Sequence, residues 1–244
     1  LAETAYFMEK GQIRFSGPTA ELLDRPDVLR SVFLGGVVGG TEAATPQPAT
    51  AEPATLEPGD AAEEPLVLSA RGVSCSFGGI MAVTDVDVNV RGGEIVGVIG
   101  PNGAGKTTLF DVISGFTPST SGEVRLGGTD VARWSPGRRA RAGLGRSFQD
   151  ARLFPSLTVV EAIAVSYDRW VRVKDPISSM LRLPTNSRSE AAVAARVDAL
   201  VELFGLTGLR DKFIGELSTG SRRMVDLAGV VAHSPSVLLL DEPS

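Results

Sequence analysis

A glycine-rich run in the middle of the chain has the composition and spacing of a phosphate-binding loop. Residues 100–107 read Gly-Pro-Asn-Gly-Ala-Gly-Lys-Thr and match the pattern G-x-x-x-x-G-K-[ST]. Glycines let the backbone curl so that successive N–H groups point at phosphate oxygens, and the start of a helix adds partial positive charge. We expect the Lys106 ammonium to reach the β- and γ-phosphates of a nucleotide and the Thr107 hydroxyl to bind Mg²⁺. A glycine-rich turn without a ligand is the alternative, and the strand and helix predicted on either side disfavour it.

Two carboxylates follow an apolar run near the end of the sequence. Residues 237–240 read Val-Leu-Leu-Leu, and Asp241 and Glu242 come next. Consecutive residues of a strand point to opposite sides, so the two carboxylates should have different roles. Asp241 could hold Mg²⁺ directly or through water, and Glu242 could then polarise the attacking water. A strand that ends in a solvated acidic turn explains the pattern equally well when the pattern is taken alone.

A third candidate site lies upstream, where small polar residues precede a helical pattern. Residues 217–223 read Leu-Ser-Thr-Gly-Ser-Arg-Arg, and apolar residues then recur at helical spacing at Met224, Leu227, Ala228 and Val231. Ser218 and Gly220 at the start of a helix could form an anion site. Taken alone, an ordinary capped helix is the more common explanation.

The apolar pattern predicts the strands and helices that must position these residues. Continuous apolar runs over 95–99 and 237–240 are typical of buried strands, and valines alternate with polar residues over 86–90 as in a half-buried strand. A helix is predicted from Lys106 to a stop at Gly115. A second, amphipathic helix is predicted where apolar residues recur at Val193, Val197, Leu200, Val201 and Phe204. Strands that alternate with helices indicate an α/β fold with a parallel sheet.

Composition divides the chain into three parts. Residues 37–65 hold five prolines, no aromatic residue and only acidic charges, so we predict a disordered acidic Pro/Ala-rich linker. Residues 1–36 are too short for a core of their own, yet they are patterned as two strands around the turn at residues 9–11, followed by a helix capped by Thr19. This first part looks like the tail of a larger domain cut off upstream, and residues 66–244 form the main domain.

The composition of the 244 residues also narrows the chemistry. One cysteine, Cys75, excludes an internal disulfide and a multi-cysteine zinc site, and one histidine, His233, excludes a histidine cluster. No apolar run approaches the roughly 18 residues of a membrane span, and no signal peptide is expected in this sequence. The net charge is −5, but the predicted linker alone carries six acidic residues and no basic one, so the rest of the chain has a net charge of +1. We interpret the basic run at Arg133, Arg138, Arg139, Arg141 and Arg146 as a solvated face and not as a nucleic-acid surface, because aromatic residues do not interleave with it.

Taken together, the candidate sites resemble the motifs of ATP-binding cassette (ABC) ATPases in order and spacing. Residues 100–108 look like the Walker A motif, 217–221 like the LSGGQ signature, and 238–242 like Walker B. Gln149 resembles the glutamine of the Q-loop, which in the family senses Mg²⁺ and the γ-phosphate and touches the membrane domains. Phe77 resembles the aromatic residue that stacks on adenine, with an ordinary core aromatic as the alternative.

The closer resemblance is to the ATPases of branched-chain amino acid importers, and it covers nearly all of residues 66–244. It rests on residues 146–154 followed by 157–161, on the Leu-Ser-Thr-Gly signature, and on an insertion around 180–184. Residues 1–36 resemble the end of another cassette, so the chain looks like a segment of a tandem-cassette fusion.

The sequence departs from the family pattern at its signature and after Walker B. Ser221 stands where the signature usually has Gln, so the contacts of Ser218 and Gly220 should survive while those of that glutamine are lost. The sequence stops at Ser244, inside the start of the D-loop, and the family's switch histidine lies further on. His233 precedes Walker B and is expected to be a surface histidine at a helix end.

The resemblance implies an α/β fold with a P-loop NTPase core and parallel sheet, an antiparallel β-subdomain and a helical subdomain, C-terminally truncated after Walker B. It implies ATP and Mg²⁺ as ligands, transmembrane permease subunits, a head-to-tail second cassette on the same or another chain, and a place on the inner face of the cell membrane. The implied catalytic residues are Glu242, Gln149 and Lys106, and the implied metal-binding residues are Thr107, Gln149 and Asp241. The implied nucleotide-binding residues are Phe77, Gly100, Pro101, Asn102, Gly103, Ala104, Gly105, Lys106, Thr107 and Thr108, with Ser218 and Gly220 serving the partner's ATP.

Two other functions compete with ATP-driven solute transport. A non-transport ABC ATPase of DNA repair, chromosome organisation or translation is disfavoured, because the stretch between Gln149 and Leu217 is too short for a long coiled coil. In addition, one cysteine cannot supply a zinc insertion, and the predicted linker is acidic where the translation type has a basic one. The other competitor is a nucleotide-binding fragment without turnover. Import is favoured over export on the resemblance alone.

Overall fold

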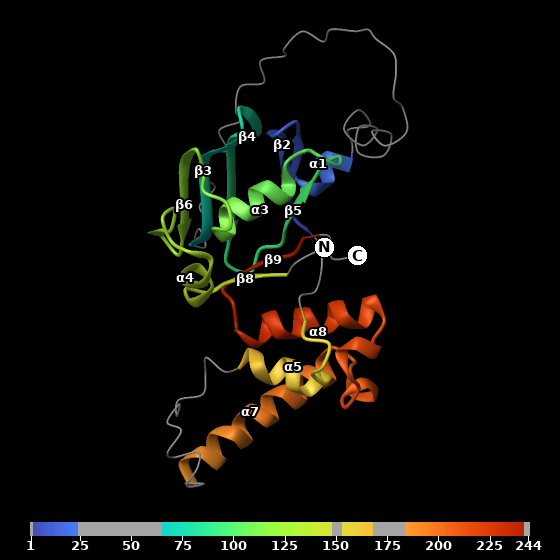
Figure 1. The fold of residues 1–244 in the computed structure, drawn as a ribbon. Coiled ribbons are helices and arrows are strands. Elements are labelled where there is room, and N and C mark those ends of the chain that lie inside the picture. The colour runs from blue at the N-terminus through green and yellow to red at the C-terminus, as the bar shows by residue number, and fades with distance from the viewer. Residues whose placement is uncertain (1, 24–64, 148–152, 168–183, 242–244) are drawn as a thin grey trace, which may run out of the picture. The chain divides into compact units, whose positions relative to one another are not determined.

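The computed structural model describes residues 2–23, 65–147, 153–167 and 184–241, which fall into two compact units, Leu1–Ser135 and Pro136–Ser244. Strands alternate with helices in both units, as the sequence pattern predicts (Figure 1). Among the described residues, none of the helices combines the length and the apolar character needed to cross a membrane. The predicted linker lies outside the described residues except for Pro65.

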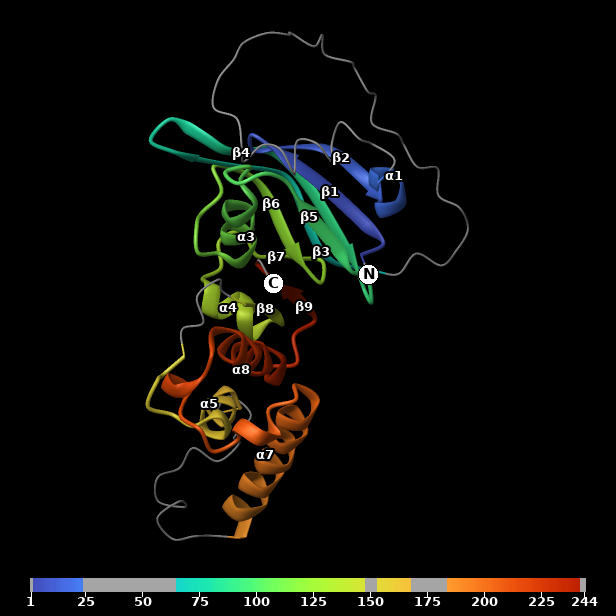
Figure 2. The same ribbon diagram turned by 90° about the vertical axis from the view of Figure 1, so that its right-hand side faces the viewer.

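A three-stranded sheet in the first unit has the order β2-β1-β5. Strands β1 (Thr4–Glu9) and β2 (Gln12–Pro18) form the predicted antiparallel hairpin, and β1 also pairs in parallel with β5 (Val96–Ile99) (Figure 2). Helix α1 (Thr19–Leu23) follows the hairpin. The Thr19 hydroxyl donates a 2.7 Å hydrogen bond to the carbonyl oxygen of Ala2, and its role as a helix cap stays a prediction.

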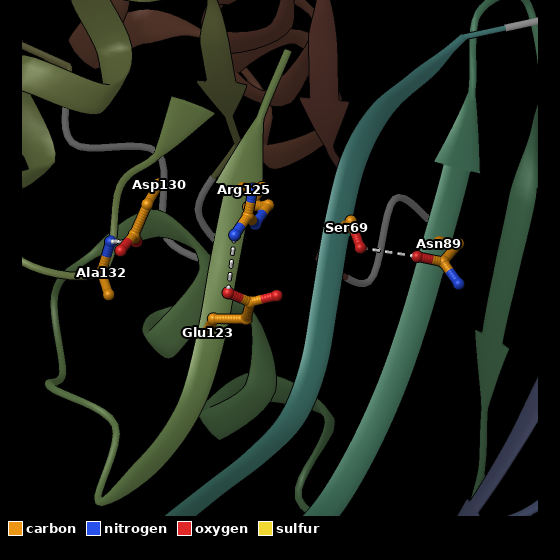
Figure 3. A network of polar contacts seen from close by, with 6 residues as sticks. All are labelled: Ser69, Asn89, Glu123, Arg125, Asp130 and Ala132. Atoms are coloured by element: carbon orange, nitrogen blue, oxygen red, sulfur yellow. Dashed lines mark hydrogen bonds and ion pairs between the residues drawn. The ribbon is translucent and has the colours of Figure 1, made fainter. Parts of the chain in front are cut away.

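The second sheet of this unit is antiparallel and has the order β4-β3-β6-β7. Its strands are β3 (Leu66–Phe77), β4 (Ile80–Arg91), β6 (Ser121–Leu126) and β7 (Thr129–Asp130). Polar contacts link residues of this sheet: Ser69 Oγ donates to Asn89 Oδ1 at 2.8 Å between β3 and β4, and Arg125 lies 3.1 Å from Glu123 along β6 (Figure 3). At β7, the Ala132 N–H donates to Asp130 Oδ1 at 2.9 Å. This sheet is the predicted antiparallel β-subdomain.

Strand β5 leads into the glycine-rich loop and then into helix α3 (Lys106–Ser114), which ends at Gly115 as predicted. Gly115 adopts φ 82°, and its N–H donates back to the Asp111 and Val112 carbonyls, so the helix closes there. The prediction that 95–99 is fully buried is wrong: β5 is half-buried and Ile95 is 61% exposed. Among the described strands of this unit, β5 pairs only with β1 and therefore lies at the edge of its sheet.

Three helices build the core of the second unit, as predicted for a helical subdomain. They are α5 (Val159–Ser166), α7 (Pro184–Leu203) and α8 (Thr219–Ala232). The periodic apolar residues of α7 face this core, where Val197, Leu200 and Val201 are buried. Helix α5 begins with a capping box, in which the Thr158 N–H donates to the Glu161 carboxylate at 2.8 Å and the Glu161 N–H donates to the Thr158 hydroxyl. Short 3-10 turns, η2 (Thr207–Leu209) and η3 (Ile214–Glu216), lead from α7 to α8.

A two-stranded parallel sheet completes the second unit. Helix α4 (Pro136–Arg141) precedes β8 (Leu144–Arg146), which pairs with β9 (Val237–Leu239). The prediction that 237–240 is buried throughout is only half right, because Val237 and Leu239 are buried while Leu238 and Leu240 are each 37% exposed. One face of β9 is therefore covered and the other is partly open.

Candidate functional site

The glycine-rich loop curls between β5 and α3 in the first unit. The Ala104 N–H donates to the Pro101 carbonyl at 3.1 Å, and Gly105 takes the left-handed φ of 102° just before the helix. No described atom lies within 4 Å of the position that a Cβ on Gly103 would take. A backbone hydrogen bond within the loop therefore stabilises its turn, and the space beside Gly103 is open.

Lys106 folds its side chain back over this loop. Its ammonium donates hydrogen bonds to the carbonyl oxygens of Gly100 at 2.7 Å and Pro101 at 3.1 Å. Thr107 is exposed in the first turn of α3, and no side chain caps that helix at Gly105, so its first backbone N–H groups are available to an anion. An ammonium, a hydroxyl and free helix N–H groups at one place fit a polyphosphate, which supports the sequence prediction for residues 100–108.

Phe77 ends β3 in the same unit, opposite Ile80 in the β3–β4 pair. Its side chain is 52% exposed, and neighbouring Ile80 and Met81 are exposed as well. The alternative that Phe77 is an ordinary core aromatic is therefore wrong. Its stacking on adenine stays a prediction.

The signature-like residues form the start of α8 in the second unit. Ser218 is the N-cap: its hydroxyl accepts a hydrogen bond from the Ser221 N–H at 3.2 Å and lies 3.0 Å from the Ser221 hydroxyl. Ser218 and Gly220 are both exposed, and no described atom lies within 4 Å of a Cβ built on Gly220. The capped helix is thus observed, and its start remains open to a ligand.

Asp241 follows β9 in the second unit and is buried, at 8% exposed. Its carboxylate lies 3.6 Å from the guanidinium of Arg146, which is 7% exposed at the end of β8. The prediction that the basic run is a solvated face is wrong for Arg146 and for Arg139, which is also buried, whereas Arg133, Arg138 and Arg141 are exposed. Sequence reasoning missed the ion pair because it depends on the parallel pairing of two strands that lie far apart in the chain.

Two predicted site residues, Gln149 and Glu242, lie outside the described residues, so their roles stay predictions. His233 is the C-cap of α8, which agrees with the predicted helix end, although its side chain is half-buried. Cys75 is buried in β3, where burial and, to a smaller extent, the charge of Asp111 raise the pKa of its thiol. A buried thiol with a raised pKa is a poor nucleophile.

Comparison with known proteins identifies the family. A family model described as ABC transporter matches residues 83–244. The high-affinity branched-chain amino acid transport ATP-binding protein BraF of Pseudomonas aeruginosa is 34% identical over 178 residues, which cover 73% of this chain and 69% of that protein. A probable ABC transporter ATP-binding protein of Azorhizobium caulinodans is 39% identical over 176 residues, covering 72% of this chain and 57% of that protein.

A solved structure gives the same assignment. The crystal structure of a nucleotide-free ATP-binding cassette from an ABC transporter matches with a TM-score of 0.59 at 27% identity, over 73% of this chain and 70% of that one. The resemblance derived from the sequence is thus confirmed at the level of family and fold. The chain therefore belongs to the ABC transporter family, as an ATP-binding ATPase of that family.

Proposed function

We propose that this ATPase drives the import of branched-chain amino acids or chemically similar solutes, bound to transmembrane permease subunits on the inner face of the cell membrane. The observation that carries the ATP-binding part is the Lys106 ammonium held over the loop of residues 100–105. The relationship to BraF, which is named for branched-chain amino acid transport, supports the choice of solute.

The chain's own groups would divide the work of phosphoryl transfer, which depends mainly on positioning and charge stabilisation. Lys106 and the N–H groups of the loop would hold the β- and γ-phosphates. Thr107, Gln149 and Asp241 would hold Mg²⁺, which supplies charge neutralisation when bound. Glu242 would orient the attacking water.

A second cassette would complete the site. Ser218 and Gly220 are exposed at the start of α8, which leaves them available to the nucleotide of a cassette arranged head to tail. We propose that residues 1–36 derive from the tail of such a cassette, that 37–65 link the two, and that 66–244 form the ATP-binding domain.

The test uses the complete chain and the variant Glu242→Gln. We expect the variant to keep ATP affinity and to lose turnover, while Glu202→Gln, an exposed carboxylate on α7, keeps both. Uptake of labelled leucine by cells that lack their own importer ATPase should be restored by the unmodified chain and not by Glu242→Gln. ATP binding without turnover in the unmodified chain would indicate a nucleotide-binding fragment. Turnover that persists in Glu242→Gln would remove this residue from catalysis, and ATP turnover without leucine uptake would overturn the proposed solute.

A further inference from the structure

The N-terminal hairpin supplies the strand next to the one that carries the phosphate loop. Thr4 to Phe7 of β1 pair in parallel with Val96 to Ile99 of β5 (Figure 2). The pairing is reinforced by the Thr4 hydroxyl, which donates to the Glu94 carboxylate at 2.6 Å, and by a small core of Ala5, Phe7 and Leu22 against which Ile99 packs. The hairpin is thus built into the first unit and is not an appendage of it.

The turn of this hairpin also contacts the phosphate loop directly. The Gly11 N–H donates to the Ala104 carbonyl at 2.9 Å, and the Gly11 carbonyl accepts from the Thr84 N–H at 2.7 Å. Gly11 therefore connects the loop on one side to β4 on the other. It has φ 80°, and a Cβ at this position would lie 2.7 Å from the Ala82 carbonyl oxygen, so only glycine fits without a shift.

Gly100 and Gly105 of the loop lie directly against residues of β1 and β4. A Cβ on Gly100 would overlap the Met8 carbonyl oxygen, and a Cβ on Gly105 would lie 2.5 Å from the Ala82 oxygen and 3.0 Å from Met8 Cε. Met8 itself is fully buried. The glycines at 100 and 105 thus have a second role, because they let the hairpin turn and β4 approach the loop closely.

We propose that Gly11 is a positioning residue for ATP binding: through its backbone it holds Ala104, so the docked hairpin sets the conformation of the phosphate loop. The proposal rests on the ATP-binding role of residues 100–107. Gly11 is not proposed to contact the nucleotide. Its effect passes through the loop backbone, where small displacements change the geometry of several phosphate contacts at once.

The first test compares two glycine-to-alanine variants of the complete chain. Gly11→Ala and Gly128→Ala impose alanine at nearly the same φ, 80° and 77°, but a Cβ on Gly128 meets nothing within 4 Å. We expect Gly11→Ala to weaken ATP affinity by about tenfold or more and Gly128→Ala to change it less than about twofold. Urea unfolding of both variants shows whether they are folded. Equal ATP affinities in two folded variants would overturn the proposal.

The second test needs no substitution in the fold. A protease site placed within residues 37–65 of the complete chain allows the hairpin to be cut from the rest after folding. We expect the fragments to stay together in gel filtration with ATP affinity kept. If the hairpin is then stripped off in mild urea and the urea is removed, we expect the affinity to fall and to recover when a peptide of residues 1–23 is added. A stripped protein that binds ATP as tightly as the uncut chain would overturn the proposal.

Lys106→Ala, measured in parallel, separates the ATP-binding role of the loop from the role of Gly11. If Lys106→Ala leaves ATP affinity unchanged, the ATP-binding role of the loop fails. If it weakens binding while removal of the hairpin has no effect, only the role of Gly11 fails.

Discussion

The guanidinium of Arg146 lies 3.6 Å from the carboxylate of Asp241, with both side chains more than nine-tenths buried. The two residues come together because β8 and β9 run in parallel, with Arg146 opposite Leu239. The carboxylate proposed to hold Mg²⁺ therefore already has a cationic partner. A bound cation would have to share this carboxylate with Arg146 or take it over.

Removing either member of this pair should destabilise the protein strongly. A single change, Arg146→Met or Asp241→Asn, leaves one buried charge without its counterpart, and we expect a loss of about 3–5 kcal/mol in the free energy of unfolding. The double variant should recover much of that loss, because no isolated buried charge remains. Urea unfolding without Mg²⁺ measures all three.

The exposed pair of Arg125 and Glu123 provides the control for this cycle. Its charged groups are closer, with 3.1 Å between the Arg125 guanidinium and the Glu123 carboxylate, but both side chains are solvated. Arg125→Met should therefore lower the free energy of unfolding by no more than about 1 kcal/mol. If Arg146→Met and Arg125→Met lower the free energy of unfolding equally, burial does not strengthen the Arg146–Asp241 pair.

Lys106→Ala should weaken ATP binding. Charge-assisted hydrogen bonds contribute about 1.5–3 kcal/mol each, which corresponds to an affinity about tenfold to a hundredfold lower. Titration with a fluorescent ATP analogue measures the change. Lys212→Ala, which removes an exposed lysine of the second unit, should leave the affinity unchanged. An unaltered titration curve for Lys106→Ala would contradict the assignment of the loop.

The capping box of α5 should make stability depend on pH. Hydrogen bonds from the Thr158 backbone N–H and hydroxyl lower the pKa of Glu161 below its ordinary value of 4.5. A lowered pKa in the folded state adds stability that is fully present above the unfolded value and is lost as the pH falls through the folded one. Glu161→Gln should therefore be less stable than the unmodified protein at about pH 7, and the difference should shrink at about pH 3. Thermal unfolding of both proteins at both pH values tests this, and stabilities that do not converge at the lower pH would contradict it.

Cys75 should react slowly with thiol reagents while the protein is folded. Its side chain is 1% exposed and burial raises its pKa, so little thiolate is accessible at neutral pH. We expect modification by a disulfide reagent to be at least about tenfold slower in buffer than in urea. A Cys75→Ala variant with a cysteine at the exposed position of Ser135 should react rapidly in both conditions. Equally rapid labelling of native Cys75 would mean that β3 opens readily.

Features set by neighbouring residues were predictable from the sequence. The loop at 100–105, the helix from Lys106 to its stop at Gly115 and the cap at Ser218 all depend on residues within a few positions of one another. The amphipathic face of α7 was predictable for the same reason, because its period is local. The sequence was therefore sufficient to predict the phosphate loop and the start of α8.

Features that depend on pairing between distant segments were missed. The hairpin lacked a predicted partner, although residues 5–8 read Ala-Tyr-Phe-Met, a continuous apolar run that is typical of a strand inside a sheet. That signal could have pointed to a parallel partner such as β5. Burial of Arg139 and of the Arg146 side chain had no comparable local signal, because it follows from where α4 and β8 pack.

The pairing of β1 with β5 also constrains the order of events during synthesis on the ribosome. Thr4 and Glu94, which bond to each other, are 90 positions apart. At a translation rate of about 5–20 residues per second, β5 is synthesised roughly 5–20 s after the hairpin. During that interval the edge of β1 that later pairs with β5 is without that partner, and an unpaired strand edge invites wrong partners. The hairpin is thus made well before the strand that fixes it in the sheet, and a translational pause before residue 96 would prolong its exposure to chaperones and aggregation.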